Sequence, residues 1–228
     1  MQGMADNSVD AVITDIPFNE VNRDSGGLRL LDKGVADSAE FDLDRTIREM
    51  VRIARGSLYV FCGQEQFSYI KKILIECSLS TRTIVWEKTN PSPMNGQSIW
   101  LSGIELCVYG KKPKATFNGH CKNTVLRYPT GNGSTDHPTE KPLRIINEFI
   151  LTSTNFGDTV LDPFMGSGTT GVGCIQTGRN FIGCDNDKTY FKIAQKRISA
   201  AEKQPLLFSH AIGETRSKQL AFDTATPA

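Results

Sequence analysis

Two short stretches in this sequence directly follow apolar, strand-like segments, and each carries side chains that could do chemistry. The first is Asp15-Ile16-Pro17-Phe18, which follows the apolar run AVIT at 11–14. The second is Asp162 with the glycine-rich loop GSGTTG at 166–171. If both apolar runs are strands of one parallel sheet, both stretches lie at its carboxyl edge, where such sheets bind ligands.

The glycine-rich loop predicts a nucleoside-binding turn. Gly166, Gly168 and Gly171 match the pattern G-x-G-x-x-G, and Asp185 ends the next expected strand. Glycines let the backbone approach a ligand closely, and an acidic residue on the second strand can accept hydrogen bonds from ribose hydroxyls. A plain tight turn is the alternative. The pattern fits both a dinucleotide, with its pyrophosphate at the helix N-terminus, and S-adenosylmethionine, with its methionine part there.

Composition limits the class of protein. The chain has 228 residues, 39% of them apolar, which suits a single core. No apolar run is long enough to cross a bilayer, and the polar N-terminus shows no signal peptide. The six cysteines form no C-x-x-C pair and there are three histidines, so we expect reduced thiols, a cytoplasmic location and no metal site.

Apolar periodicity predicts alternating strands and helices along the chain. This alternation indicates an α/β fold with a doubly wound, mainly parallel sheet. We expect one domain over 1–202 and a loosely ordered tail at 203–228. The strands are expected at 11–14, 57–62, 81–88, 103–110, 158–162 and 179–185, and the helices within 41–54, 64–76, 137–153, 166–178 and 188–202.

The net charge of +1 conceals a local excess of positive charge. The segment 106–135 contains no acidic residue. A solvated loop is the simplest interpretation of such a cluster. The cluster is of interest because it lies between the two stretches described above. Its basic residues are Lys111, Lys112, Lys114, Lys122 and Arg127.

Four motifs in order resemble the β-class amino methyltransferases of DNA. They are TDIPF, HPTEKP, VLDPFMGSGTT and FIGCDNDKTYFKIAQKRI, and the resemblance covers about residues 5–200. In that family the catalytic motif precedes the cofactor motif in the chain. The resemblance therefore implies a Rossmann-like fold that uses S-adenosylmethionine, permuted so that the catalytic half comes first.

The resemblance also implies which residues hold S-adenosylmethionine. Asp185 should approach the ribose. The residues expected around the methionine part are Asp162, Pro163, Phe164, Gly166, Gly168 and Thr169, and those expected near its carboxylate are Thr139, Lys141 and Pro142.

The Asp15 turn suits an exocyclic amine, whose lone pair is drawn into the base. Acceptors on its hydrogens would release that lone pair. Asp15 supplies one acceptor, and Pro17 holds Ile16 extended, so that the Ile16 carbonyl can be the second. Phe18 offers a face on which a flipped base can stack. Methyl transfer would then be direct and in line, with catalysis by positioning and electrostatics.

An aspartate at the start of this motif points to adenine. Family members that act on the cytosine amine usually carry Ser-Pro-Pro-Tyr. This chain departs from the family by having Ile16 for the first proline and Phe18 for the tyrosine. Neither change removes an acceptor or the stacking surface, but cytosine stays an alternative target.

The basic segment lies where the family places its DNA-recognition residues, which implies contacts with the phosphates of double-stranded DNA. We take this insert to span about 110–136. Because the segment is short, we expect a short recognition site, relaxed specificity, or help from a second subunit in a homodimer.

Several alternatives remain at this point. A nicotinamide-dependent oxidoreductase would explain the glycine pattern but not the Asp15 turn. A non-catalytic nucleic-acid-binding domain would need no Asp15, whose carboxylate could instead cap a helix. RNA or protein could replace DNA as the substrate.

Related sequences carry one more strand, with an acidic turn, before the segment that resembles 4–15. Met1 stands close to Asp15 here, so we expect no counterpart of that strand. We expect its absence to leave residues 11–14 as a bare edge of the sheet.

Overall fold

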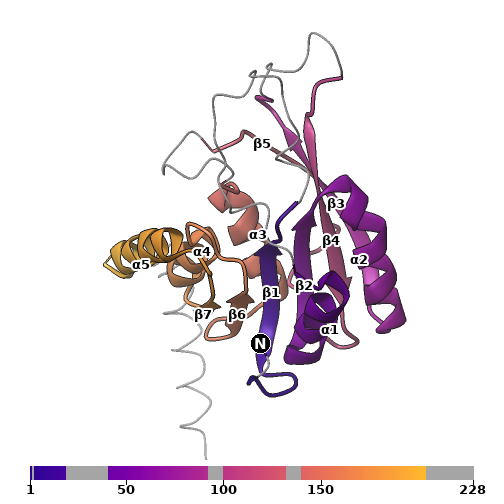
Figure 1. Cartoon of the computed structure of the whole chain (residues 1–228), viewed down its shortest axis with the longest axis horizontal. Coiled ribbons are helices and arrows are strands. Elements are labelled where there is room, and N and C mark those ends of the chain that lie inside the picture. Colours follow the sequence, from indigo (N-terminus) through magenta and orange to yellow (C-terminus); the bar gives the residue numbers. More distant parts are fainter. Residues whose placement is uncertain (2, 19–40, 92–99, 132–139, 204–228) are drawn as a thin grey trace, which may run out of the picture.

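One mixed sheet organises the molecule (Figure 1). The computed structural model describes residues 1, 3–18, 41–91, 100–131 and 140–203. In this part of the chain seven strands are ordered β5-β3-β4-β2-β1-β6-β7. The strands are β1 (Val9–Asp15), β2 (Ala54–Cys62), β3 (Ser80–Lys88), β4 (Ile104–Lys111), β5 (Val125–Tyr128), β6 (Thr159–Asp162) and β7 (Asn180–Gly183). The helices are α1 (Leu43–Ile53), α2 (Gln64–Glu76), α3 (Leu143–Ser153), α4 (Thr169–Thr177) and α5 (Lys188–Glu202).

The expected α/β fold with a mainly parallel sheet is confirmed. β4 runs antiparallel to both β2 and β3, and the other neighbouring strands are parallel. The described residues between β3 and β4 contain no helix, and adjacent strands that are joined without a crossover run in opposite directions. β5 was not predicted, because four residues inside a polar, basic segment give too short a pattern to recognise.

Two helical layers cover the sheet, and the alternation of side chains along the strands explains why. Val12 and Val60 point to the face covered by α1 and α2, in one core cluster with Ile47. Ile13 and Phe61, each one residue further along, point to the opposite face and pack with α3. Strands buried on both faces read as continuous apolar runs, as the AVIT segment does.

The expected bare edge at residues 11–14 is wrong. β1 pairs with β2 on one side and with β6 on the other, so it lies in the middle of the sheet. The catalytic and cofactor halves of the chain therefore meet along β1 and β6. Within the described residues, β7 pairs only with β6 and ends the sheet.

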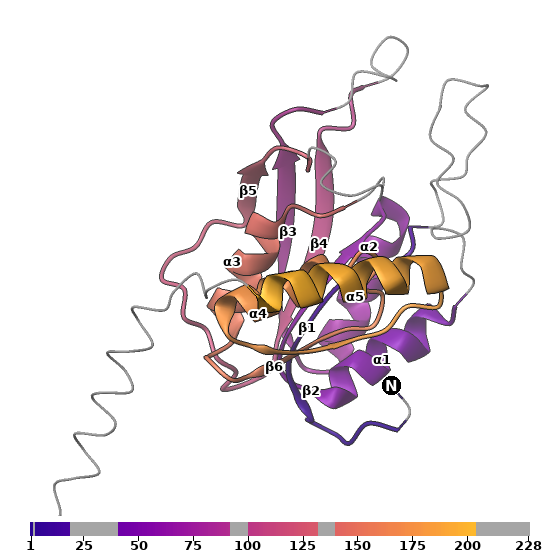
Figure 2. The same ribbon diagram turned by 90° about the vertical axis from the view of Figure 1, so that its left-hand side faces the viewer.

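The last helix packs over the cofactor half. Figure 2 shows α5 crossing in front of the strands. The Asp187 side chain caps its N-terminus by accepting from the N–H groups of Thr189 and Tyr190. None of the helices in the described ranges is long and apolar enough to span a membrane. The expected tail lies outside those ranges except for Lys203.

Removing a buried side chain from β1 should destabilise the whole sheet. Ile13 is fully buried beneath α3, so Ile13→Ala should lower the free energy of unfolding by about 2–5 kcal/mol. Ile75→Ala, which shortens an exposed side chain on α2, is the matched control and should change it by about 0.5 kcal/mol or less. Urea denaturation measures both. Equal losses for the two variants would contradict this description of the core.

Candidate functional site

The Asp15 turn is fixed at the carboxyl end of β1 by its neighbours on β2 and α2. The Ile16 N–H donates to the Phe61 carbonyl, which extends the pairing of β1 with β2 beyond Asp15. The Gln66 amide donates to the Pro17 carbonyl at 2.8 Å, while its oxygen accepts from the Gly63 N–H at 3.0 Å. Gln66 thus anchors the turn to the start of α2.

The Lys141 ammonium is buried against the Asp15 carboxylate. Lys141 is 7% exposed, and its Nζ lies 2.5 Å from Asp15 Oδ2 and 3.1 Å from Glu105 Oε2. The same ammonium lies 5.0 Å from the ring centre of Phe18 and 5.3 Å from that of Phe61. Burial alone would lower the pKa of Lys141, but the two carboxylates raise it above its ordinary value, so the side chain is a permanent cation.

Glu105 enters this cluster from β4 with a second lysine. Its Oε1 lies 2.8 Å from Lys88 Nζ, on the neighbouring strand β3. Burial favours the protonated form of Glu105, but Lys141 and Lys88 together hold its pKa below the usual range. Both carboxylate oxygens of Glu105 therefore face a cation.

Asp162 joins the cofactor half to the catalytic half. Its Oδ1 accepts from the Thr14 hydroxyl at 2.8 Å and from the Phe164 N–H at 3.1 Å, and its Oδ2 accepts from the Thr170 hydroxyl at 2.7 Å. Thr14 immediately precedes Asp15, so the ends of β1 and β6 are locked together. Burial raises the pKa of Asp162 to about 6, although these hydrogen bonds oppose the rise.

The glycine-rich loop turns tightly into α4. Gly166 and Gly168 have φ angles of 50° and 81°, in the left-handed region that favours glycine. A Cβ at Gly168 would lie 2.8 Å from Ala194 Cβ on α5. The Asp185 carboxylate accepts from the Gly166 N–H at 2.9 Å, so the loop and Asp185 are side by side, as the spacing predicted.

A second ion pair ties the segment before α3 to this loop. Arg197 of α5 pairs with Glu140 and donates to the Ser167 carbonyl and hydroxyl. The Thr169 hydroxyl also donates to Glu140 at 3.1 Å. Glu140 is thus bound to residues around the glycine-rich loop, and its neighbour Lys141 is bound to the Asp15 turn.

The structure brings most of the predicted site residues to one edge. Pro163 and Phe164 follow Asp162 in the loop after β6, and Pro142 begins α3 next to Lys141. Thr139 lies outside the described residues. The roles predicted for these residues toward a base or a cofactor stay predictions, since the structure describes the protein chain alone.

The five basic residues do not form one surface. In the strand register, Lys111 of β4 lies opposite Ser57 of β2, and Ser57 lies opposite Ala11 in the amino-terminal part of β1. Lys112 and Lys114 follow it at that end of the sheet, away from Asp15, and Lys112 donates to Asn7. Lys122 pairs with Glu148 of α3.

Arg127 lies at the other end of the sheet. In the strand register, Arg127 of β5 lies opposite Glu87 of β3, and Glu87 lies opposite Ile104 of β4. The residue of β4 level with Asp15 is Cys107, so Arg127 lies beyond the carboxyl end of β1, on the side of the site. Its side chain is 70% exposed.

Some of the residues that the sequence reasoning missed lie outside the four motifs, and others stand inside a motif without an assigned role. Glu105 stood in the expected strand GIELCVYG, and a carboxylate within a buried strand was a usable signal. Lys88, Gln66, Glu140 and Arg197 carried no comparable signal, because only the fold shows what they touch.

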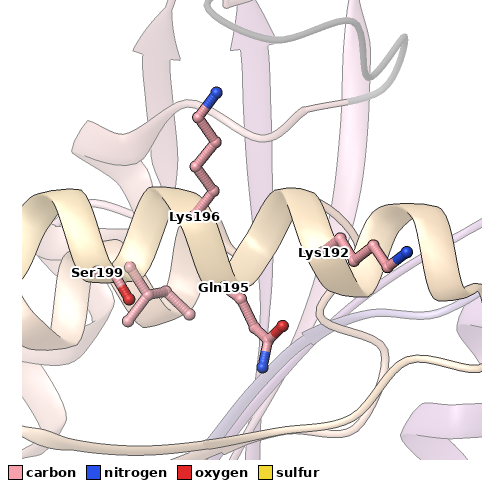
Figure 3. Close-up of a pocket in the computed structure, with 5 residues that line it drawn as sticks. Lys192, Gln195, Lys196 and Ser199 are labelled. Carbon is pink, nitrogen blue, oxygen red and sulfur yellow. The ribbon is translucent and has the colours of Figure 1, made fainter.

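A shallow groove lies outside this site, along α5 (Figure 3). It is lined by Lys192, Gln195, Lys196, Ile198 and Ser199. Figure 3 shows the labelled side chains spreading away from one another rather than converging on a ligand. In the described part of the chain, no group of three or more His, Cys, Asp or Glu side chains is placed to hold a metal ion.

Comparison with known proteins identifies what this chain is similar to. The model of the N6/N4 family described as DNA methylase matches residues 9–196. A type II methyltransferase of Streptococcus pneumoniae, M2.DpnII, is 28% identical, over 86% of this chain and 85% of its own length. M2.LlaDCHI of Lactococcus lactis subsp. cremoris, also a type II methyltransferase, is 30% identical, over 84% of this chain and 82% of its own.

The fold has a counterpart among solved structures. The crystal structure of M1.HpyAVI in complex with S-adenosylmethionine superposes with a TM-score of 0.67 and 32% identity. The match covers 86% of this chain and 90% of that one.

The buried Asp162 should make stability depend on pH in a predictable direction. Its pKa is about 6 in the folded chain and 3.8 ordinarily, so folding favours the protonated form. That contribution to stability is present below about pH 4 and is lost as the pH rises through about 6. Relative to Asp162→Asn, the wild type should lose up to about 3 kcal/mol between about pH 4 and pH 7. Urea denaturation across this range measures the difference; a difference that does not change with pH would contradict the raised pKa.

Proposed function

Because this chain belongs to the N6/N4 DNA methylase family, we propose that it transfers a methyl group from S-adenosylmethionine to the exocyclic amine of adenine in DNA. It is an S-adenosylmethionine-dependent DNA methyltransferase of the type II, restriction–modification kind. Family membership sets aside the nicotinamide-dependent oxidoreductase. The base, the residue roles and the DNA-contacting surface are the proposal.

The observation that carries the proposal is the position of Asp15. Its carboxylate lies at the carboxyl end of a central strand, and its neighbour Thr14 is hydrogen-bonded to Asp162 of the cofactor half. An acceptor for an amine is thereby held next to the loop expected to bind the methyl donor. Lys141 fixes the Oδ2 oxygen, and we assign the amine hydrogen to Oδ1.

The residues of the loop fit S-adenosylmethionine. Gly168 begins α4 in a left-handed conformation and has no side chain to cap the helix, so the first N–H groups of α4 suit the carboxylate of the methionine part. Asp185 lies beside Gly166, where a carboxylate can accept from ribose hydroxyls. When bound, the cofactor supplies a methyl group on a positively charged sulfur.

The Asp15 turn binds the base and activates its amine. Asp15 and the Ile16 carbonyl accept from the two hydrogens of the amine, which frees its lone pair for the methyl group. Phe18, at the mouth of the turn, stacks on the base after it has been flipped out of the duplex, a contact of about 1–3 kcal/mol. Lys141 keeps the Asp15 carboxylate ionised and oriented.

Adenine is favoured over cytosine by the aspartate at the start of the motif. Asp15 accepts only when ionised, and a neighbouring cation favours that state. A serine at this position, usual in the cytosine-directed members that this motif resembles, would be a weaker acceptor because it is neutral.

The DNA-contacting surface is best supported on the carboxyl side of the sheet. Arg127 is exposed there, and its pair with Glu87 is an exposed one that contributes little, so a phosphate can replace the carboxylate. Lys111, Lys112 and Lys114 lie at the opposite end. A duplex that delivers a base to Asp15 would reach Arg127 before it reached these lysines.

We also propose that the chain works in the cytoplasm and that two copies share the recognition of DNA as a homodimer. Its six cysteines are free, which suits a reducing compartment. Sedimentation with and without a duplex measures the number of copies.

Labelled methyl transfer onto unmethylated genomic DNA tests the function. We expect labelled N6-methyladenine from the wild type and none from Asp15→Ala. The affinity of the variant for S-adenosylmethionine should stay within about twofold, because the carboxylate serves the base. Asp44→Ala, which removes an exposed carboxylate on α1, is the control and should retain activity.

Mass spectrometry of the nucleosides identifies the modified base. Labelled N4-methylcytosine would overturn the choice of adenine, and transfer only to RNA or protein would overturn DNA as the substrate. An active Asp15→Ala enzyme would remove Asp15 from the catalytic role.

Salt dependence separates the two groups of basic residues. Each phosphate contact contributes about 0.9 to the slope of log affinity against log salt for duplex DNA, so Arg127→Ala should lower the slope by about that amount. Replacing Lys111, Lys112 and Lys114 together by alanine should leave the slope unchanged, because these lysines lie away from the site. A lowered slope for the triple variant alone would instead place the duplex at the amino-terminal end of the sheet.

A further inference from the structure

Four charged side chains from separate parts of the chain form a row that ends at the catalytic turn. Lys88 Nζ lies 2.8 Å from Glu105, Lys141 Nζ lies 3.1 Å from Glu105, and Lys141 Nζ lies 2.5 Å from Asp15. The signs alternate along the row, from β3 through β4 and the segment before α3 to β1. Only Asp15 and Lys141 belong to the motifs discussed above.

Burial makes this row unlike a surface ion pair. The Lys141 and Glu105 side chains are 7% and 19% exposed. A charge held away from water is costly unless it is paired with good geometry, and the loss of one partner leaves the other uncompensated. Lys141 is compensated by two carboxylates, one of which is Asp15.

We propose that Glu105 is a positioning residue for methyl transfer, which acts through Lys141 to hold the Asp15 carboxylate in its reactive orientation. The inference rests on the proposed function of Asp15. The Lys141 ammonium contacts both Glu105 and Asp15, so two carboxylates together fix its place. Without Glu105, the Lys141 side chain can move together with Asp15 or reorient toward an incoming ligand.

Charge balance gives Glu105 a second effect on the same step. Methyl transfer would join the amine nitrogen to the methyl carbon and leave the carbon–sulfur electron pair on sulfur. Positive charge would develop on the nitrogen until it released a proton to water. An unbalanced Lys141 cation beside Asp15 would oppose that charge. Glu105 offsets the charge of Lys141, while Lys88 pairs with the other carboxylate oxygen of Glu105.

Nearby thiols do not alter this balance. The Cys62 and Cys107 side chains are buried close to Asp15 and Lys141. Burial raises the pKa of Cys62 to about 12 and that of Cys107 well above its ordinary value, so both stay neutral.

The first experiment compares Glu105→Gln with Glu49→Gln. Glu49 is also half-buried and paired with an arginine, Arg52 on the same helix α1, but lies outside the site. Glu105→Gln should lower the single-turnover rate of methyl transfer by roughly ten- to a hundredfold, the scale expected for a displaced reacting group. Its affinities for S-adenosylmethionine and DNA should stay within about twofold, and Glu49→Gln should match the wild type.

The second experiment tests the route through Lys141. In a Lys141→Met background, Glu105→Gln should change the rate by less than about twofold, because the group through which Glu105 acts is gone. Full additivity of the two losses would overturn the proposal. So would a Glu105→Gln enzyme that keeps the wild-type rate, or one that loses cofactor affinity in proportion to its rate.

A third measurement does not depend on activity. Nitrogen NMR of labelled lysine at neutral pH reports the surroundings of the Lys141 ammonium, whose chemical shift should change in Glu105→Gln and stay unchanged in Glu49→Gln. An unchanged Lys141 chemical shift in Glu105→Gln would overturn the proposal. A wild-type chain that methylates no DNA would overturn the proposed function instead, so the two failures are distinguishable.

Discussion

The site depends on the ion pairs that the buried Lys141 ammonium forms with two carboxylates. It is held between Asp15 of the catalytic turn and Glu105 of β4, and it contacts the rings of Phe18 and Phe61. Its neighbour Glu140 is paired with Arg197, which also binds the loop that precedes α4. Two adjacent residues thus connect the carboxylate that we propose binds the base with the loop that we propose binds the methyl donor.

The sheet order makes this connection short. Because β1 pairs with β6, the end of the catalytic half meets the end of the cofactor half, although Thr14 and Asp162 are far apart in the chain. In a permuted chain the order of the motifs along the sequence differs while their places at the sheet edge stay the same. Thr14, Asp162 and Thr170 fix that meeting point, and the raised pKa of Asp162 is the energetic consequence of burying it.

The sequence predicted features in which neighbouring residues act together. The Asp15 turn, the glycine-rich loop and Asp185 were recognisable because their chemistry is local or spaced by one strand and helix. Arg197 was not, since its partners come from distant segments. The edge position of β1 was predicted wrongly, because strand neighbours depend on the topology of the whole sheet. The basic residues were grouped by sequence, but β4 is antiparallel and carries Lys111 away from the edge that holds Asp15.

A crystal structure of the chain with S-adenosylmethionine tests the central claim most directly. The account predicts that the methionine carboxylate lies at the N-terminus of α4, that the methyl group faces Asp15 and Phe18, and that the Lys141 ammonium stays between Asp15 and Glu105. The family resemblance alone implied that Lys141 approaches the cofactor carboxylate, whereas this account keeps it on Asp15. A Lys141 side chain that leaves Asp15 to bind that carboxylate would contradict the account, and so would a cofactor bound away from the glycine-rich loop.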